Sequence, residues 1–275
     1  MRMNGHGRLI SMVFGVLSAC GIPAHAISLH FWPTNIAVEA RPGQVVSQTF
    51  NLTLSKECSP SRFQTRVEDW WRSPDNNQTF YAPAGTLSRS CGQWCSINPV
   101  ESSVNPGQTM TIKVSIRVPD NVQPGGYWAA LTVDQVPDPL APKLKGVGMT
   151  LKGSVSVGIF VEIPEIKRSA RITGVSVTGN RVSVTLCNDG NTPLKVNPNF
   201  EFYKPGQDKP IATVKIGAQP LLTDQHNKCE FSTLLPNEKD LPSGRYKVRV
   251  IVDAGLDFLL GAENEVSITR APSSG

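Results

Sequence analysis

Residues 147–163 read VGMTLKGSVSVGIFVEI, an almost unbroken alternation of apolar residues with small or polar ones. Alternate side chains of a β-strand point to opposite faces, so the pattern predicts a strand with one apolar face and one small, polar face. The segment is far longer than the usual strand of about five or six residues. Such a strand either fills a sandwich core or, at a sheet edge, can be paired by a strand of another chain.

Shorter segments with the same period of two lie on both sides of it, separated by turn residues. In the first half they are Ser28–Val38, Val45–Ser55, Arg62–Trp71, Thr109–Val118 and Gly126–Val136. In the second half they are Ala170–Val177, Arg181–Cys187, Leu194–Tyr203, Ile211–Ile216, Cys229–Leu235, Gly244–Val252 and Phe258–Thr269. About six or seven short strands per ~100 residues is typical of a β-sandwich. We therefore predict an all-β fold of two immunoglobulin-like β-sandwich domains in tandem, after a cleaved signal peptide.

The predicted fold divides the chain into three parts. Residues 1–26 are expected to be the signal peptide, residues 27–164 an N-terminal sandwich and residues 165–270 a C-terminal sandwich. The two sandwiches meet where the apolar alternation ends in the polar link Pro164–Arg168. Both halves also carry a tyrosine just after a proline- and glycine-containing corner, Tyr127 and Tyr246, which is the place of a tyrosine corner in such folds.

The N-terminal residues have the pattern of an export signal. An apolar run, Leu9–Ala19, follows two arginines and is too short for a membrane span of about 20 residues. Ala24-His25-Ala26 then fits a small-x-small cleavage site. A second interpretation stays open, because Leu17–Cys20 fits a lipoprotein cleavage box that would leave Cys20 lipidated. The sequence thus predicts export, with either a soluble or a lipid-anchored product.

Charge and motifs exclude several classes of protein. The net charge of +5 falls to +3 without Arg2 and Arg8 of the signal segment, too little to predict a nucleic-acid partner. His30 and His226 lie in no nucleophile or metal motif, and the chain has no phosphate-binding loop. We therefore expect a non-enzymatic protein with no catalytic residue, metal, cofactor or small-molecule substrate. An acid pair assembled across strands, as in a carbohydrate-active sandwich, stays the enzymatic alternative.

Five cysteines follow the signal segment, namely Cys58, Cys91, Cys95, Cys187 and Cys229. Exported thiols usually become disulfides, and the spacing of Cys91 and Cys95 matches no zinc site. We expect pairing within domains, Cys187 with Cys229 and Cys58 with either Cys91 or Cys95. One thiol is then left over.

The tryptophans are unevenly distributed, with all five before residue 130. Most are expected in the core, but the adjacent Trp70 and Trp71 cannot both face inward on one strand. An apolar contact surface on the first domain is therefore the second interpretation. Together with the lipoprotein box at Cys20, it defines an alternative function, a non-enzymatic surface or lipid-anchored structural or adhesive module.

Short motifs occur in a characteristic order over about residues 28–269. They are Trp32–Val38, Val67–Trp70, Pro106–Gln108, Gly126–Trp128, Val157–Pro164, Asn188–Leu194, Leu241–Tyr246 and Val250–Gly255. In this order they resemble the periplasmic pilus-assembly chaperones, a family of two immunoglobulin-like domains that works with outer-membrane ushers. The resemblance implies a periplasmic protein that binds pilus or fimbrial subunits and stabilises them before their assembly at an usher.

The resemblance also implies site residues. In that family the long last strand of the first domain donates alternate apolar side chains to the subunit. The residues at those positions here are Met149, Leu151, Val155, Val157 and Ile159. The family binds the subunit's terminal carboxylate through an arginine and a lysine, but the matching positions here hold Asn35 and Gly158. Lys152, on the same strand face as Gly158, is the candidate substitute.

Overall fold

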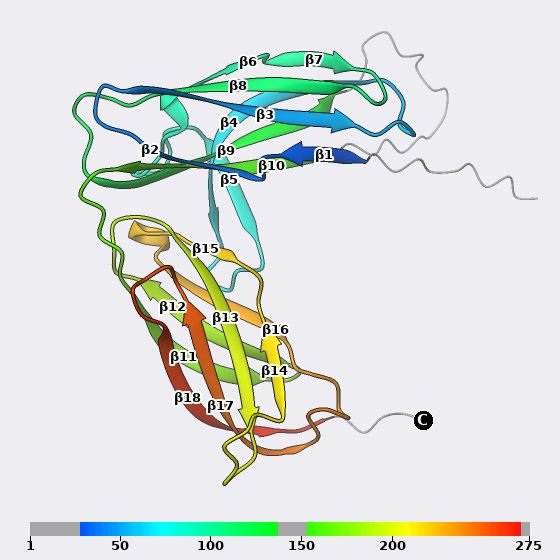
Figure 1. Cartoon of the computed structure of the whole chain (residues 1–275), viewed down its shortest axis with the longest axis vertical. Coiled ribbons are helices and arrows are strands. Elements are labelled where there is room, and N and C mark those ends of the chain that lie inside the picture. Colours follow the sequence, from blue (N-terminus) through cyan, green and yellow to red (C-terminus); the bar gives the residue numbers. More distant parts are fainter. Residues whose placement is uncertain (1–27, 137–152, 271–275) are drawn as a thin grey trace, which may run out of the picture.

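The computed structural model describes residues 28–136 and 153–270, which form two β-sandwiches at an angle to each other (Figure 1). The helical elements of these residues are two short 3₁₀ turns, η1 (Gly92–Trp94) and η2 (Asp224–His226). In the same residues, no helix has the length and apolar character to cross a membrane. The predicted all-β fold of two sandwiches is confirmed. The expected signal segment and Cys20 lie outside the described residues.

The first sandwich consists of two sheets that enclose a continuous apolar core. One sheet contains, in order, β1 (Leu29–Trp32), β3 (Val45–Leu54), β8 (Thr109–Arg117) and β6 (Cys95–Asn98). The other contains β2 (Asn35–Glu39), β10 (Ser154–Ile163), β9 (Gly125–Val136), β4 (Ser61–Arg72) and β5 (Thr79–Pro83), with β7 (Glu101–Val104) also paired to β4. The alternation read from the sequence appears as burial, because Ile112, Val114 and Ile116 of β8 are completely buried while the residues between them are not.

The opening strand contributes to both sheets of the first sandwich. β1 pairs antiparallel with β3, and β2 pairs in parallel with β10. The sequence predicted one strand over Ser28–Val38, so this change of sheet is a difference from the prediction. Pro33 lies between the two strands and has no N–H group to donate to a ladder, which favours a break in pairing at this point.

The second sandwich packs a small sheet on a larger one. The small sheet contains β11 (Ala170–Thr178), β12 (Arg181–Asn188) and β16 (Lys228–Leu234). The larger contains β14 (Ala212–Lys215), β13 (Leu194–Tyr203), β17 (Gly244–Asp253) and β18 (Leu260–Ile268), with β15 (Gln219–Leu221) also paired to β13. Phe200, Phe202 and Phe231 are completely buried in its core. Each contributes about 1.5–3 kcal/mol by leaving water, so these rings are a major part of the domain's stability.

Each sandwich has a tyrosine corner. The hydroxyl of Tyr127 donates to the carbonyl of Gln123 at 3.0 Å, and that of Tyr246 donates to the carbonyl of Pro242 at 2.8 Å. Both bonds reach back four residues to the turn that precedes the strand. The corners predicted from the sequence are therefore present in both domains.

The pairing predicted between Cys187 and Cys229 is wrong, because the strand register places their side chains on opposite faces. In the β12–β16 ladder Cys187 lies opposite Lys228, and Cys229 lies opposite Leu186. Residues directly opposite one another share a face, and the face alternates at each step along the strand. The two thiols therefore face away from each other, and both are free.

The pairing of Cys58 with Cys91 or Cys95 is also wrong. Cys95 lies beside β8 at the position level with Val46, near the start of β3, whereas Cys58 follows Leu54 at the other end of β3. Eight strand residues at roughly 3.3 Å each separate these ends by about 26 Å. A disulfide requires Cα atoms within about 7 Å, so Cys58 cannot reach Cys95 or its neighbour Cys91.

A buried carboxylate holds the loop after β5. Asp69 of β4 is completely buried, and its Oδ2 accepts the backbone N–H groups of Gly85 at 3.1 Å and Leu87 at 2.8 Å. Its Oδ1 accepts the hydroxyl of Ser90 at 2.5 Å. Three donors therefore compensate the burial of this charge, and they fix the conformation of residues 85–90.

We expect Asp69→Asn to lower the free energy of unfolding by about 2–4 kcal/mol, because charge-assisted bonds are lost and an amide N–H₂ faces backbone donors. Urea unfolding measures the change. The control is Glu101→Gln, which removes a partly exposed carboxylate whose ion pair with Arg62 is worth at most about 1 kcal/mol. Equal losses in the two variants would contradict the role given to Asp69.

Candidate functional site

The edge of β10 is open over its first residues. β9 pairs with β10 from Ser154 to Ile163, but β2 pairs with it only from Gly158 onward. Within the described residues, Ser154–Val157 therefore have a strand partner on one side alone. An edge of this kind presents backbone N–H and C=O groups to which another extended chain can add.

The predicted donor residues fall into three groups. Met149, Leu151 and the candidate anchor Lys152 lie outside the described residues. Val155 is half-buried beside the open edge. Val157 and Ile159 are 3% and 0% exposed and belong to the core of the first sandwich.

Val157 and Ile159 therefore leave the predicted donor set. The apolar face of the strand is continuous, and the sequence does not mark where it passes from a projecting segment into the sandwich. A side chain that fills the core of its own domain is not free to fill a groove in another protein. Only the part of the donor set before Val157 remains a prediction.

The two positions at which the sequence departs from the family's charged anchors are neighbours in space. Asn35 lies opposite Gly158 in the parallel β2–β10 pair, and both line the cleft between the domains. A side chain at position 158 would meet the Phe160 ring, since an ideal Cβ there lies 2.7 Å from Cε2. Phe160 thus occupies the space that a larger residue at 158 would need.

An apolar cluster forms the floor of this region and joins the two domains. Trp70, Trp128 and Leu222 are buried in it, and the Phe160 ring packs edge-on against Trp70 with centroids 6.3 Å apart. The indole of Trp128 donates to the carbonyl of Trp70 at 2.9 Å. Leu222 comes from the second domain, so the cluster fixes the domains against each other as well as lining the cleft.

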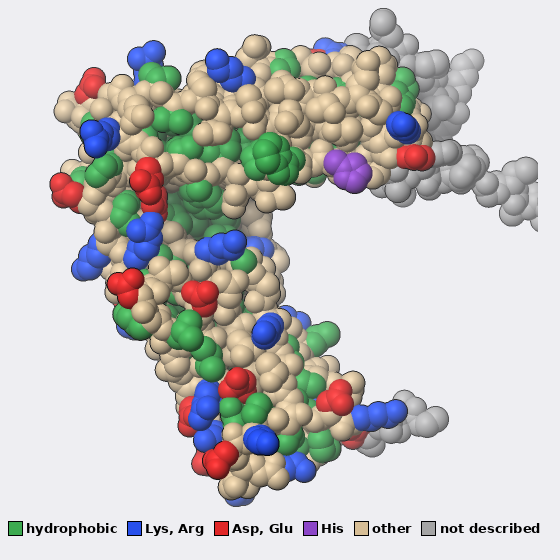
Figure 2. Space-filling view, viewed as in Figure 1, with side chains coloured by type: hydrophobic (Ala, Val, Ile, Leu, Met, Phe, Trp, Pro, Cys, Tyr) green, Lys and Arg blue, Asp and Glu red, His purple; other side chains and the backbone are tan. Residues whose placement is uncertain are grey.

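A cavity of about 530 Å³ lies in the cleft, between β2 and β10 on one side and the start of β13 with β15 on the other. Figure 2 shows the hollow between the two domains. Its charged lining residues are Glu39, Glu162, Arg168 and Lys195. Arg168 pairs with Glu162 at 2.6 Å, whereas Lys195 has no ion-pair partner among the described residues.

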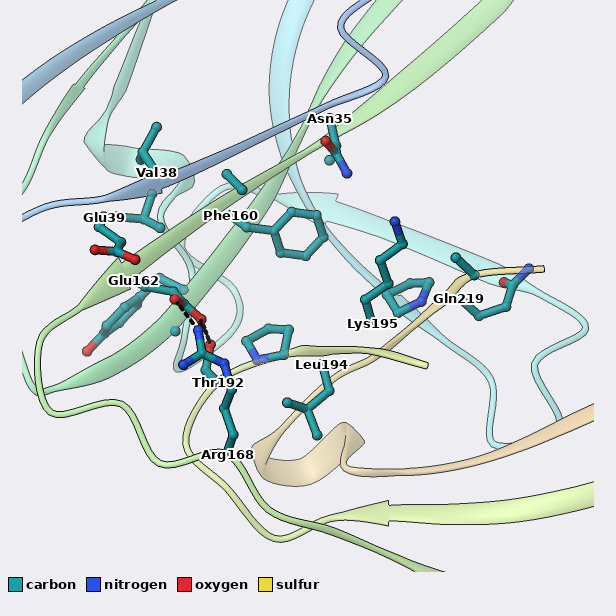
Figure 3. Close-up of a pocket in the computed structure, with 18 of the residues that line it drawn as sticks. Asn35, Val38, Glu39, Phe160, Glu162, Arg168, Thr192, Leu194, Lys195 and Gln219 are labelled. Atoms are coloured by element: carbon teal, nitrogen blue, oxygen red, sulfur yellow. Dashed lines mark hydrogen bonds and ion pairs between the residues drawn. The ribbon is translucent and has the colours of Figure 1, made fainter. Parts of the chain in front are cut away.

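Lys195 is the functional candidate that sequence reasoning missed. It lies at the start of β13 in the second domain, and Figure 3 shows its side chain extending into the cavity toward the side that carries Asn35 and Phe160. An unpaired ammonium above an apolar floor is suited to an anionic group. Nothing in the sequence around Lys195 marks it, because it reaches the cleft only through the packing of one domain on the other.

Hydrogen bonds around the link Pro164–Arg168 connect the two domains at one end of the cleft. The guanidinium of Arg168 donates to both carboxylate oxygens of Glu162, and the hydroxyl of Thr192 donates to Oε1 at 2.9 Å (Figure 3). The N–H of Gly126 donates to the carbonyl of Asn191 at 2.8 Å. This close approach requires glycine, since a Cβ at 126 would lie 2.2 Å from the Thr192 hydroxyl.

The hairpin β4–β5 fastens the domains at a second place, and Figure 1 shows it reaching down to the second sandwich. The N–H of Glu230 donates to the carbonyl of Pro74 at 2.7 Å, and Arg72 donates to the side chain of Gln219 at 3.1 Å. On the neighbouring loop, Arg89 lies 3.4 Å from Asp224. Contacts on both sides of the cleft thus hold the angle between the domains.

The tryptophans do not gather into a contact surface. Trp70 and Trp128 are buried, and Trp71 and Trp94 are half-buried against aromatic neighbours. Trp32 is 71% exposed. The aromatic distribution that suggested an adhesive face is explained mainly by the core and by the domain interface.

The Trp71 ring lies between Phe80 and His226, with centroid distances of 5.6 and 5.4 Å and interplanar angles of 21° and 20°. His226 belongs to η2 of the second domain, so this stack is a further contact between domains. Burial lowers the pKa of His226, and the nearby Asp224 acts in the opposite direction.

We expect the stability contributed by this stack to be present above about pH 6.5 and to decline as the pH falls below it. The unfolded chain has a histidine pKa of about 6.5 and binds the proton before the folded protein does, so acid favours unfolding until the lower folded pKa is passed. Melting temperatures between pH 7.5 and 5 measure the effect. His226→Gln should flatten the profile, whereas the exposed control His30→Gln should leave it unchanged. Identical profiles in wild type and His226→Gln would contradict the assignment.

No family model and no curated protein sequence matches the chain. Many solved structures are similar to it, and three of them serve as examples. The first is a chain of the CsuC–CsuE chaperone–tip adhesion subunit pre-assembly complex of Acinetobacter baumannii, with 13% identity, a TM-score of 0.47 and coverage of 86% of this chain and 97% of that one. The second is the E. coli chaperone DraB, with 16% identity, a TM-score of 0.43 and coverage of 86% of this chain and 98% of that one. The third is the Pseudomonas aeruginosa CupB2 chaperone, with 10% identity, a TM-score of 0.45 and coverage of 87% of this chain and 100% of that one. The sequence motifs resemble the same group of proteins, and at these identities the likeness concerns the fold.

Proposed function

We propose that the protein is a periplasmic chaperone that binds pilus or fimbrial subunits along the open edge of β10 and holds their carboxyl end in the cleft, before assembly at an outer-membrane usher. One observation carries the proposal. Within the described residues, the edge at Ser154–Val157 is paired on one side only, and it leads directly into a cleft in which Lys195 has no acidic partner.

Strand addition supplies the first part of the binding. A subunit segment that pairs with the open edge forms backbone hydrogen bonds, and alternate side chains of this chain then enter the partner. Val155 and, by the alternation of the sequence, Leu151 and Met149 are the donors on this face. Their apolar surface would be buried at roughly 25 cal/mol per Å² of area removed from water.

Charge supplies the second part. The family's anchor positions hold Asn35 and Gly158, so the cationic group for a terminal carboxylate must come from elsewhere. Lys195 extends into the cavity from the opposite wall and has no acidic partner among the described residues. The Asn35 amide, also at the cavity, can donate a further hydrogen bond. In this proposal Lys195 takes the role first given to Lys152.

Donor-strand variants test the proposal by co-purification with candidate subunits encoded by neighbouring genes. We expect Leu151→Asp and Val155→Asp to abolish capture, because each places a charge where an apolar side chain enters the partner. The matched control is Val45→Asp, at an exposed position at the start of β3, and it should retain capture. Unchanged capture by Leu151→Asp and Val155→Asp, or no capture by the wild type, would refute the proposal.

Lys195→Glu tests the anchor separately. We expect it to weaken subunit binding about 10- to 100-fold, because a charge-assisted hydrogen bond contributes about 1.5–3 kcal/mol and the variant adds repulsion. Titration calorimetry measures the affinity for a subunit with a free carboxyl end and for one with an amidated end. The control Lys215→Glu, an exposed lysine of β14, should change neither value. If amidation weakens binding to wild type and to Lys195→Glu equally, the anchor lies elsewhere.

A further inference from the structure

Two cysteines flank the η1 turn, which lies at the end of the segment between β5 and β6. Cys91 immediately precedes the turn and is completely buried, and Cys95 follows it as the first residue of β6 and is half-buried. The N–H of Trp94 donates to the carbonyl of Cys91 at 3.0 Å, which folds the chain back on itself. The Cys95 thiol lies 3.3 Å from the same carbonyl.

The Cys91 thiol is buried in the core, and the half-buried Cys95 thiol lies beside the Cys91 backbone. Burial raises the pKa of the Cys91 thiol well above its ordinary value, and a hydrogen bond with the Cys95 thiol and the charge of Asp69 raise it further. Among the described residues no cationic side chain lowers this pKa, so Cys91 is not activated as a first nucleophile. The described residues also contain no group of three or more metal-binding side chains, so the pair has no third ligand there for a metal.

We propose that Cys91 and Cys95 form a disulfide in the mature protein. The other three cysteines of the described residues have no such partner. Cys187 and Cys229 face opposite sides of their sheet, and Cys58 lies at the far end of the first sandwich. The bond therefore joins two residues four apart in sequence instead of stapling distant strands.

The chemistry needs an oxidant disulfide, such as glutathione disulfide or the disulfide of an exported oxidase. The Cys95 thiol, the more exposed of the two, loses its proton, and the thiolate attacks the oxidant, forming a mixed disulfide and releasing one oxidant thiolate. Cys91 then loses its proton and attacks the Cys95 sulfur, releasing the second thiolate. Two electrons pass to the oxidant, and the two protons complete its two thiols.

The disulfide would stiffen a segment that bridges the domains. Asp69 fixes the same loop between one and six residues before Cys91. Within that loop Ser88 donates to Asp224 at 3.0 Å, and Arg89 forms an ion pair with the same carboxylate. Arg89 also lies over the Tyr127 ring, and that ring packs against Trp94 at 4.6 Å. The disulfide would hold the loop at the η1 turn, and the Asp69 hydrogen bonds hold it at residues 85–90. The part of the loop that contacts Asp224 would therefore be rigid.

Differential alkylation of the exported wild-type protein tests the bond. Free thiols are blocked with N-ethylmaleimide in denaturant, disulfides are reduced, and the new thiols are labelled with iodoacetamide. Trypsin releases residues 90–113 as one peptide that contains both cysteines and no other. We expect both to carry the iodoacetamide label and Cys58, Cys187 and Cys229 to carry maleimide. Maleimide on Cys91 and Cys95, or a link from either to Cys58, would overturn the proposal.

Thermal unfolding with and without reductant gives a second readout. We expect reduction to lower the melting temperature of the wild type and to leave that of Cys91→Ala/Cys95→Ala unchanged. The matched control Cys187→Ala/Cys229→Ala should keep the wild-type response. A shift on reduction that persists in Cys91→Ala/Cys95→Ala would overturn the assignment. Neither experiment uses a binding partner, so both are independent of the proposed chaperone function.

Discussion

The incomplete pairing of β10 with β2 is the constraint on which the rest of the molecule depends. Because β2 joins β10 at Asn35 and Gly158, the strand is covered on both sides from there to its end and on one side before it. The part of β10 from Gly158 onward, which pairs on both sides, completes the sheet of the first sandwich and places Phe160 at the domain interface. An open edge invites non-specific pairing, but the burial of Val157 in the core fixes the register of the strand, so the edge that it presents is a defined one.

The same pairing explains why the cleft has its unusual charge distribution. Phe160 fills the space above Gly158, so that position cannot hold a long cationic side chain without moving the ring. Arg168 is already neutralised by Glu162. The remaining cation, Lys195, enters from the opposite wall. In this chain the unpaired cation among the described cavity residues is therefore supplied by the second domain and not by position 158.

The sequence predicts those features that depend on neighbours along the chain. Alternation of apolar residues predicts most strands, and Tyr127 and Tyr246 predict the corners. The sequence does not predict features that depend on strand register or on how the second domain packs. Cys187 and Cys229 fail as a pair because a shift of one residue in a ladder reverses the face of a side chain. Lys195 has no local signal at all, since its role appears only when the domains are packed together.

The cleft is formed before a partner arrives, because contacts on both sides hold the domains at one angle. Such rigidity lowers the cost of ordering in the proposed complex, because the domains need not be arranged on binding. Backbone pairing alone does not choose a direction, since both parallel and antiparallel ladders form. β10 runs toward the cleft, so a partner with its carboxylate at Lys195 lies parallel to β10. In the reverse direction the carboxylate would lie at the far end of the open edge, away from Lys195, and this charge interaction would be lost. The position of Lys195 at the end of the open edge therefore favours the parallel direction in the proposed complex.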